Sequence, residues 1–299
     1  MRLSAATLPA LDLITTQHGE NMIALRTGLT CLLLALGSFA LGSLDARAEQ
    51  SPAQDDRLKE VIAGDHRSAD NAARDAYRHP YETLSFFGIK PDMTVVEIYP
   101  GRGWYTEILA PYLKEAGTLY AAEPPADPSY EALQRSLDAF DQKLKDAPEL
   151  YGQVKRTKVT EDGDIAPAES ADLVVTFRNT HSFMRAGTEE ASFAAMFKAL
   201  KPGGVLGLVQ HRGDPDVEQD PKAGKGYVNQ DYVIALAKNA GFELVETSEI
   251  NANPNDTKDY AKGVWTLPPS FRLGDEDREK YAAIGESDRM TLKFVKPAP

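Results

Sequence analysis

Two histidines, His181 and His211, each follow a short apolar run that predicts a buried strand. One run is followed directly by Arg178, Asn179 and His181, and the other by His211. An imidazole can accept or donate a proton near neutral pH, so these positions suit acid–base chemistry on a bound substrate. A lone histidine more often packs or forms a hydrogen bond, whereas two histidines at strand ends favour a catalytic site.

A second group of residues could bind a nucleoside. A predicted strand carries Glu97 and leads into a turn with Gly101 and Gly103, after which a helical pattern begins. A strand that enters a helix through glycines leaves backbone N–H groups free at the carboxyl edge of a sheet, where nucleotides bind. The dinucleotide pattern G-x-G-x-x-G is absent, because its third glycine position is Thr106. Glu123 lies about 20 residues further on, where a carboxylate can accept hydrogen bonds from both ribose hydroxyls.

Alternating strands and helices are predicted to position these residues. Short β-branched or aliphatic runs between turn formers predict strands, and apolar residues at three-to-four-residue spacing predict helices. The predicted strands are 95–98, 118–123, 154–159, 172–177, 205–210, 242–250 and 289–295. The predicted helices are 58–62, 69–77, 104–113, 133–144 and 193–200, with His79-Pro80 ending the second. This order predicts an α/β fold with a mostly parallel sheet.

Two motifs resemble those of the class I S-adenosylmethionine-dependent methyltransferases. In that family an acidic residue ends the first strand and a G-x-G-x-G turn follows. Here the acid is Glu97, and Gly101 and Gly103 match the second and third glycines. Tyr99 replaces the first glycine. The family's L-K-P-G-G sequence stands unchanged at 200–204, and the P-G-x-G-W-Y-T-E turn resembles that of a group of bacterial methyltransferases with secretion signals.

This resemblance implies a Rossmann-like, doubly wound fold with a seven-stranded, mostly parallel sheet and an antiparallel last strand. It implies that S-adenosylmethionine is the cofactor and that its methyl group passes to a small-molecule acceptor. The residues implied in cofactor binding are Glu97, Tyr99, Gly101, Gly103 and Glu123. One acidic residue of 161–164 would approach the adenine.

The family's strand order also bears on the catalytic residues. Because the fourth and fifth strands are neighbours in that order, His181 and His211 are expected side by side, with Arg178 and Asn179 on the same rim. His181 is the first candidate for the base that removes the acceptor's proton. Positioning of the two substrates would supply most of the acceleration.

Residues 1–48 are predicted to be a leader that contains a secretory signal at 22–48. Basic Arg26 precedes an apolar run at 29–41, and an A-x-A cleavage sequence follows. A membrane span needs ~20 apolar residues, so the run is too short and no stable membrane anchor is expected after cleavage. The only cysteine, Cys31, lies in this run, which fits a mature protein in an oxidising compartment. The protein is therefore expected to be periplasmic or secreted.

The remainder divides into an N-terminal helical segment at 49–90 and a methyltransferase-like domain at 91–299. The helix at 69–77 is expected to lie over the cofactor edge, and insertions at 213–226 and 251–286 to wall a substrate pocket. The formal net charge is −12 and no basic stripe is present, which argues against nucleic acid as a partner. The sequence makes no prediction about oligomeric state.

Two other functions remain open from the sequence. S-adenosylmethionine is made inside cells, so an exported protein would lack a supply. A non-catalytic nucleoside-binding or small-ligand-binding protein with the same fold is one alternative, and Tyr99 in the turn favours it. The other is a metal-dependent hydrolase in which His181 and His211, with Asp288 or another carboxylate, hold the metal ion, because imidazoles and a carboxylate suffice as ligands.

Overall fold

The computed structural model of the protein describes residues 56–160 and 164–298. The predicted leader at 1–48 and residues 161–163 of the acidic turn lie outside the described residues. No helix within the described ranges is long and apolar enough to cross a membrane.

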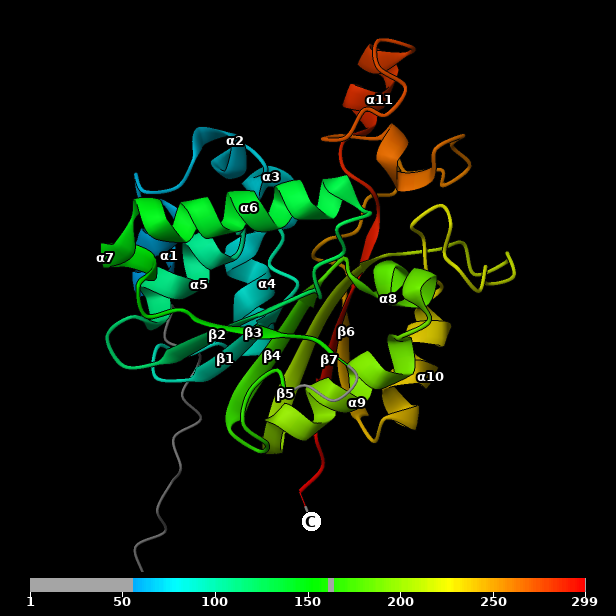
Figure 1. The fold of residues 1–299 in the computed structure, drawn as a ribbon. Helices are drawn as coiled ribbons and strands as arrows, with labels where there is room; N and C mark the ends of the chain where they lie inside the picture. The colour runs from blue at the N-terminus through cyan, green and yellow to red at the C-terminus, as the bar shows by residue number, and fades with distance from the viewer. Residues whose placement is uncertain (1–55, 161–163, 299) are drawn as a thin grey trace, which may run out of the picture. The chain divides into compact units, whose positions relative to one another are not determined.

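Seven strands form one sheet in the order β3-β2-β1-β4-β5-β7-β6 (Figure 1). β7 runs antiparallel to both of its neighbours, and the other neighbouring pairs are parallel. The strands are β1 (Thr94–Ile98), β2 (Thr118–Glu123), β3 (Lys155–Lys158), β4 (Ala171–Phe177), β5 (Leu200–His211), β6 (Glu243–Ser248) and β7 (Arg289–Val295). The predicted doubly wound sheet with an antiparallel last strand is therefore confirmed.

Helices cover both faces of this sheet. Side chains of α1, α4, α5 and α7 pack with Val95 and Val175 on one face, and those of α8, α9 and α10 pack with Val96 and Val174 on the other. The alternation follows from the period of two along a strand. The helices are α1 (Asp56–Ile62), α2 (Ala69–Ala72), α3 (Asp75–Arg78), α4 (Pro80–Phe87), α5 (Thr106–Leu113), α6 (Glu131–Asp146), α7 (Pro148–Tyr151), α8 (Thr180–Ala186), α9 (Glu189–Ala199), α10 (Gln230–Asn239), α11 (Arg278–Ile284) and the 3₁₀ helix η1 (Gly263–Thr266).

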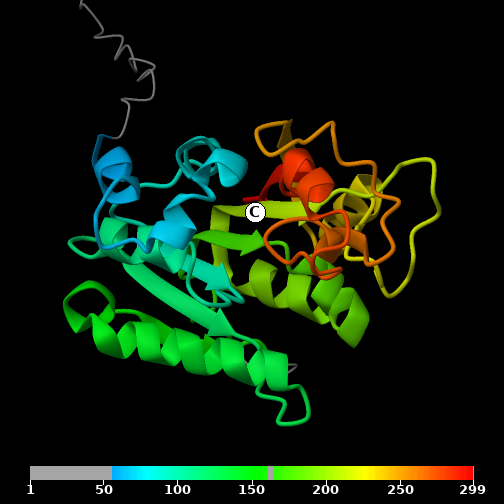
Figure 2. The same ribbon diagram turned by 90° about the horizontal axis from the view of Figure 1, so that it is seen from above.

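The carboxyl edge of the parallel strands is covered by segments from distant parts of the chain. β7 runs downward in Figure 1, so the parallel strands end at the top, where α2, α3, α8 and α11 lie. Figure 2 looks down on this edge and shows the α2–α3 segment and the α11 segment above the sheet. This edge is where open α/β sheets bind their ligands.

The fifth strand begins earlier than the sequence predicted. Leu200 pairs with Ala171 of β4, and the Lys296 backbone N–H donates to the Gly204 carbonyl at 2.9 Å. The L-K-P-G-G sequence is therefore the first part of β5 and not a loop before it. The pairing of the chain beyond β7 with these glycines extends the strand.

The N-terminal segment contains four short helices where two were predicted. His79 has a left-handed backbone with φ 42° and joins α3 to α4, and Pro80 is the first residue of α4. His79-Pro80 therefore begins a helix instead of ending the region, as the fixed φ of proline allows at a first helical position. Leu58 of α1 and Leu84 of α4 are fully buried against the sheet, so the described part of this segment shares the core of the domain.

Candidate active site

A cavity of about 900 Å³ lies at the carboxyl edge of the sheet, and we call it the edge cavity. Its walls come from the α2–α3 segment, the turn after β1, the end of β4, the end of β5 and the insertion before β7. The residues that line it include Asn71, Arg74, Arg78, Glu97, Tyr99, Gly101, Tyr105, Phe177, Arg178, Asn179, His181, His211, Trp265 and Pro269. The predicted cover from the 69–77 region and from the 251–286 insertion is thus confirmed.

The turn after β1 has a backbone that favours glycine. Tyr99, Gly101 and Gly103 have φ of 49°, 62° and 81°, all in the left-handed region. A Cβ at Gly101 would meet no atom within 4 Å, so this glycine faces open space. A Cβ at Gly103 would lie 2.9 Å from Lys143 Cδ and 3.2 Å from the Phe140 ring. Gly101 therefore leaves room for a ligand, whereas Gly103 lets α6 pack closely.

The Tyr99 ring is half-buried and packs edge-on against Phe183 of α8, with 5.1 Å between the ring centroids. Burial raises the pKa of its hydroxyl to about 12, so the side chain is neutral. Its left-handed backbone is the conformation that a glycine would adopt freely at the first position of the motif. The Tyr99 ring is therefore held in the turn by its contact with Phe183 of α8.

Glu97 is buried in the wall of the edge cavity, with 2% of its surface exposed. The Thr106 hydroxyl donates to Glu97 Oε2 at 2.6 Å. Burial raises the pKa of the carboxyl group to about 7, although the Thr106 hydrogen bond opposes this. Within the described part of the chain, no Lys, Arg or His forms an ion pair with it. A ligand with a positive charge beside Glu97 would stabilise the ionised carboxylate.

Glu123 lies at the end of β2, as predicted, but its oxygens are already engaged. Arg156 of β3 donates from Nε and Nη2 to the two carboxylate oxygens, at 2.5 and 2.9 Å. Glu123 is not among the residues that line the edge cavity. The sequence did not reveal this partner, because nothing in the spacing showed that β3 would place an arginine beside the end of β2.

His181 and His211 lie side by side, as expected from neighbouring β4 and β5. Their ring centroids are 5.5 Å apart, and the Trp265 ring is 5.8 Å from that of His181. Burial lowers the pKa of His181 to about 4, with a further contribution from Arg185. Burial and the adjacent His181 lower the pKa of His211 well below its ordinary value. Both rings are therefore neutral at neutral pH.

Hydrogen bonds distinguish the two imidazoles. Gln210 Nε2 donates to the Gly226 carbonyl at 3.0 Å and lies 3.3 Å from His181 Nδ1. An amide nitrogen is a donor, so His181 Nδ1 accepts and the ring proton is on Nε2. His211 Nδ1 instead contacts the Ser287 hydroxyl, which can accept as well as donate. His211 can therefore present an unprotonated Nε2 to a substrate.

Arg178 and Asn179 have different environments. The Asn179 side-chain amide donates to the Ile98 carbonyl at 2.8 Å and ties the end of β4 to the end of β1. Arg178 has a left-handed backbone with φ 64°, and its guanidinium lines the edge cavity. Asn179 therefore positions the rim, while Arg178 is available to a ligand.

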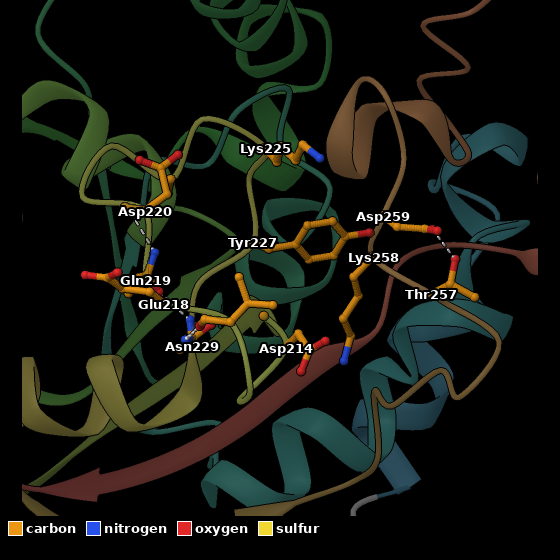
Figure 3. A pocket seen from close by; sticks show the side chains of 13 residues that line it. Asp214, Glu218, Gln219, Asp220, Lys225, Tyr227, Asn229, Thr257, Lys258 and Asp259 are labelled. Atoms are coloured by element: carbon orange, nitrogen blue, oxygen red, sulfur yellow. Dashed lines mark hydrogen bonds between the residues drawn. The ribbon is translucent and has the colours of Figure 1, made fainter.

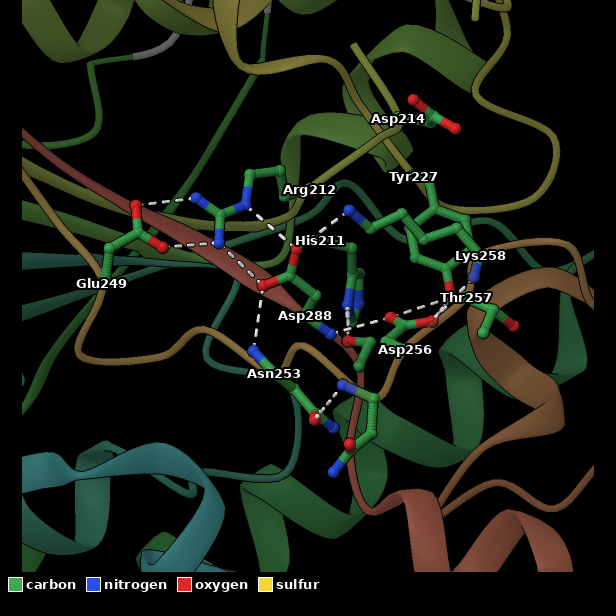
Figure 4. Close-up of polar contacts among 12 residues, drawn as sticks. His211, Arg212, Asp214, Tyr227, Glu249, Asn253, Asp256, Thr257, Lys258 and Asp288 are labelled. Atoms are coloured by element: carbon green, nitrogen blue, oxygen red, sulfur yellow. Dashed lines mark hydrogen bonds and ion pairs between the residues drawn. The ribbon is translucent and has the colours of Figure 1, made fainter. Parts of the chain in front are cut away.

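Asp288, the candidate third ligand of the hypothetical metal site, already forms ion pairs with Arg212 and Lys258 (Figure 4). Arg212 donates to both of its carboxylate oxygens, at 2.9 and 3.0 Å, and Lys258 Nζ lies 3.0 Å away. The Asn253 backbone N–H is a further donor at 3.0 Å. No group of three suitable metal-ligating side chains occurs among the residues that the structure describes. The hydrolase alternative thus lacks its ligand set within the described chain.

The insertion at 213–226 lines a different cavity, of about 440 Å³ (Figure 3). This second cavity lies between that loop and residues 257–259, with the Tyr227 side chain in its wall. The two cavities share none of their lining residues. The two insertions therefore do line one cavity together, but it is separate from the edge cavity, to which the 213–226 loop contributes indirectly, through the Gly226 carbonyl that holds Gln210.

Comparison with known proteins supports the fold. No protein-family model and no curated protein matches the chain. A SAM-dependent methyltransferase from Aquifex aeolicus is similar over 80% of this chain and 98% of its own, with a TM-score of 0.51 and 15% identity. The cyclase SpnF is similar over 81% of this chain and 92% of its own, with a TM-score of 0.52 and 15% identity. The chain thus has the class I methyltransferase fold, which does not by itself decide the reaction.

Proposed function

We propose that this protein binds S-adenosylmethionine in the edge cavity and transfers its methyl group to a small molecule. The observation that carries the proposal is Glu97, a buried carboxylate without a cationic partner among the described residues, beside a glycine turn that is open at Gly101. The cofactor carries an ammonium group, which would supply the missing positive charge. The fold of the chain supports the same conclusion.

The proposed cofactor-binding residues are those of the first two strand ends. Glu97 would accept from the ammonium group, and the open backbone around Gly101 would leave room for the ligand. The half-buried Tyr99 ring lies in the cavity wall, held against α8. Glu123 would meet the ribose only if Arg156 releases one of its oxygens. When bound, the cofactor supplies an electrophilic methyl group on a sulfonium.

His211 is the proposed base, in place of His181. Its Nδ1–H can donate to Ser287, which leaves Nε2 free to accept the acceptor's proton. His181 Nε2 carries a proton in the observed hydrogen-bonding arrangement, so this ring would donate to the acceptor instead. Both rings line the edge cavity, and the Trp265 ring packs edge-on against that of His181.

The test is calorimetric titration of the full chain with S-adenosylmethionine, S-adenosylhomocysteine and adenosine, followed by assay of S-adenosylhomocysteine formation with a small-molecule extract. The parent should bind both sulfur compounds more tightly than adenosine. His211→Gln should reduce product formation by about 100-fold or more and leave S-adenosylhomocysteine binding intact. His66→Gln, at a histidine outside the edge cavity, is the matched control. Absence of binding by either sulfur compound would refute the proposal.

A binding protein that retains the fold is the second candidate. The Glu123–Arg156 pair favours a small ligand other than a nucleoside for it, because a ribose would have to displace two charged hydrogen bonds. Export through the predicted leader would remove the cofactor supply and favour it further. This candidate predicts that S-adenosylhomocysteine binds no more tightly than adenosine and that no methylated product forms.

A further inference from the structure

Four arginines gather where the α2–α3 segment, the end of β4 and the start of β7 meet. We call Arg74, Arg78, Arg178 and Arg289 the arginine cluster. Arg74, Arg78 and Arg178 line the edge cavity, and Arg289, which is not among its lining residues, donates to the Tyr77 carbonyl of α3 at 3.0 Å. These residues come from sequence positions up to 215 apart, so the fold alone brings their charges together.

One carboxylate, Glu286, lies among these cations. Arg74 Nε donates to Glu286 Oε1 at 2.6 Å, and Arg289 Nη2 donates to Oε2. Arg78 Nε is 3.7 Å from the same carboxylate, too far for a hydrogen bond. Burial disfavours the charged form of Glu286, but Arg289 and Arg78 hold its pKa well below the ordinary value. A single negative charge thus faces four positive ones.

Arg78 is the most poorly satisfied member of the cluster. Its side chain is 3% exposed, and its Nε and Nη1 are buried without a hydrogen-bond partner. The guanidinium lies over the Trp104 ring, 4.4 Å from the centroid, which orients it without satisfying its N–H groups. Burial and the nearby Arg178 lower its pKa well below the ordinary value. A buried cation with unpaired donors is costly unless a ligand supplies acceptors.

Arg178 adds a second unpaired charge. No hydrogen bond or ion pair of its guanidinium is found with the described residues, although its own backbone N–H donates to Val209. Burial and Arg289 lower its pKa to about 9, so it remains a cation at neutral pH. Two carboxylates line the edge cavity, the exposed Asp70 and the buried Glu97, which is bonded to Thr106. Neither is found paired with Arg78 or Arg178 among the described residues. Both guanidinium groups are therefore available to an anion.

From this geometry we propose that the methyl acceptor carries a carboxylate or phosphate group, which Arg78 and Arg178 bind. Guanidinium groups bind such oxyanions through paired N–H donors. The assignment of the anion to the acceptor rests on the proposed function. The cofactor has a carboxylate of its own, but one such group would offset only one of the three positive charges left after Glu286. An anionic acceptor accounts for the remainder.

The test uses inorganic phosphate and malonate as probes, titrated into the full chain by calorimetry with and without saturating S-adenosylhomocysteine. Both probes should bind in both conditions. Arg178→Gln and Arg78→Gln should weaken phosphate binding about tenfold or more, with S-adenosylhomocysteine binding within about twofold of the parent. Arg178→Lys should recover part of the loss, since it restores the charge. The matched control is Arg135→Gln, which removes an exposed arginine on α6.

Unfolding temperature separates binding from a structural role. Removing an unpaired cation should leave the unfolding temperature of Arg178→Gln unchanged or raise it, whereas a structural arginine would lower it. Failure of both probes to bind overturns the inference. Displacement of phosphate by S-adenosylhomocysteine also overturns it, because the anion site would then belong to the cofactor's carboxylate. In that case the arginine variants would weaken the binding of S-adenosylhomocysteine but not that of 5′-methylthioadenosine, which lacks that carboxylate.

The two proposals can fail separately in these experiments. Binding of S-adenosylhomocysteine without any probe binding would leave the proposed function and remove the anionic acceptor. Arginine-dependent phosphate binding without any S-adenosylhomocysteine binding would remove the methyltransferase proposal, and with it the assignment of the anion to a methyl acceptor.

Discussion

If the proposed function is right, Glu97 should couple the binding of S-adenosylmethionine to pH. Its carboxyl group is buried, and its pKa is raised to about 7, so it is roughly half protonated at neutral pH before a ligand binds. An ammonium group beside it would favour the carboxylate and return its pKa toward the ordinary value of 4.5. Binding should therefore release a proton. The perturbation that tests this is Glu97→Gln, which keeps the shape and abolishes the titration.

The size of the effect follows from the two pKa values. With a pKa of about 7 in the free protein, roughly nine-tenths of the carboxyl groups are ionised at pH 8 and one-tenth at pH 6. If only the ionised form binds well, the affinity for S-adenosylhomocysteine falls about tenfold between pH 8 and pH 6. The free energy of unfolding should depend on pH through the same pKa. Because folding raises it, the Glu97 contribution to stability is present below pH 4.5 and is lost as pH rises through about 7.

The assay is calorimetry at pH 6, 7 and 8 in buffers that differ in ionisation enthalpy, which counts the released protons. Parent protein should show the tenfold change and a release of about 0.9 proton at pH 6. Glu97→Gln should bind weakly with no dependence on pH, and it should be more stable than the parent at pH 8. 5′-Methylthioadenosine, which lacks the ammonium, is the control ligand, and Glu131→Gln, at an exposed carboxylate of α6 outside the edge cavity, is the control variant. Equal S-adenosylhomocysteine affinity of parent and Glu97→Gln at every pH would refute the reasoning.

Two further predictions concern the turn after β1. Gly101→Ala places a Cβ in open cavity space, so it should weaken S-adenosylhomocysteine binding and lower stability only by the backbone cost of about 1 kcal/mol. Gly103→Ala should lower the unfolding temperature more, because its Cβ would lie 2.9 Å from Lys143 Cδ and 3.2 Å from Phe140. Unfolding and binding curves for the pair check this, and the reverse order of stabilities would contradict it. Tyr99→Gly loses a ring contact of about 0.5–1.5 kcal/mol but removes a left-handed backbone cost of about 1 kcal/mol, so it should change stability little. It should weaken S-adenosylhomocysteine binding by no more than about thirtyfold. A gain in affinity would show that the ring occupies cofactor space and would favour the binding-protein alternative.

Strands were the most predictable part of the fold. β7 has the bounds predicted for it, and β4 begins one residue earlier than predicted, because continuous apolar runs between turn formers mark buried strands well. The short helices were missed or merged. α2 and α3 have four residues each, and α8 has seven, which is too few turns for an apolar period to emerge.

The site was predictable where residues follow a strand. Glu97, His181 and His211 meet at one edge because parallel strands end there, and their sequence positions alone imply it. The partners that set their chemistry were not predictable. Ser287 reaches His211 from 76 residues away, and Arg74 reaches Glu286 across 212 residues. Such contacts depend on how the insertions close over the sheet, and no local pattern in the chain encodes that.

The arginine cluster and the proposed base are coupled through their charges. After burial and His181, the arginines Arg289, Arg178 and Arg78 all contribute to lowering the pKa of His211, which makes it a weak base in the free protein. An oxyanion bound by Arg78 and Arg178 would offset part of that positive charge and raise the pKa of His211 toward its ordinary value. A neutral acceptor would leave the base weak. Binding of an anionic acceptor by the arginine cluster would therefore also make His211 a stronger base for the acceptor's proton.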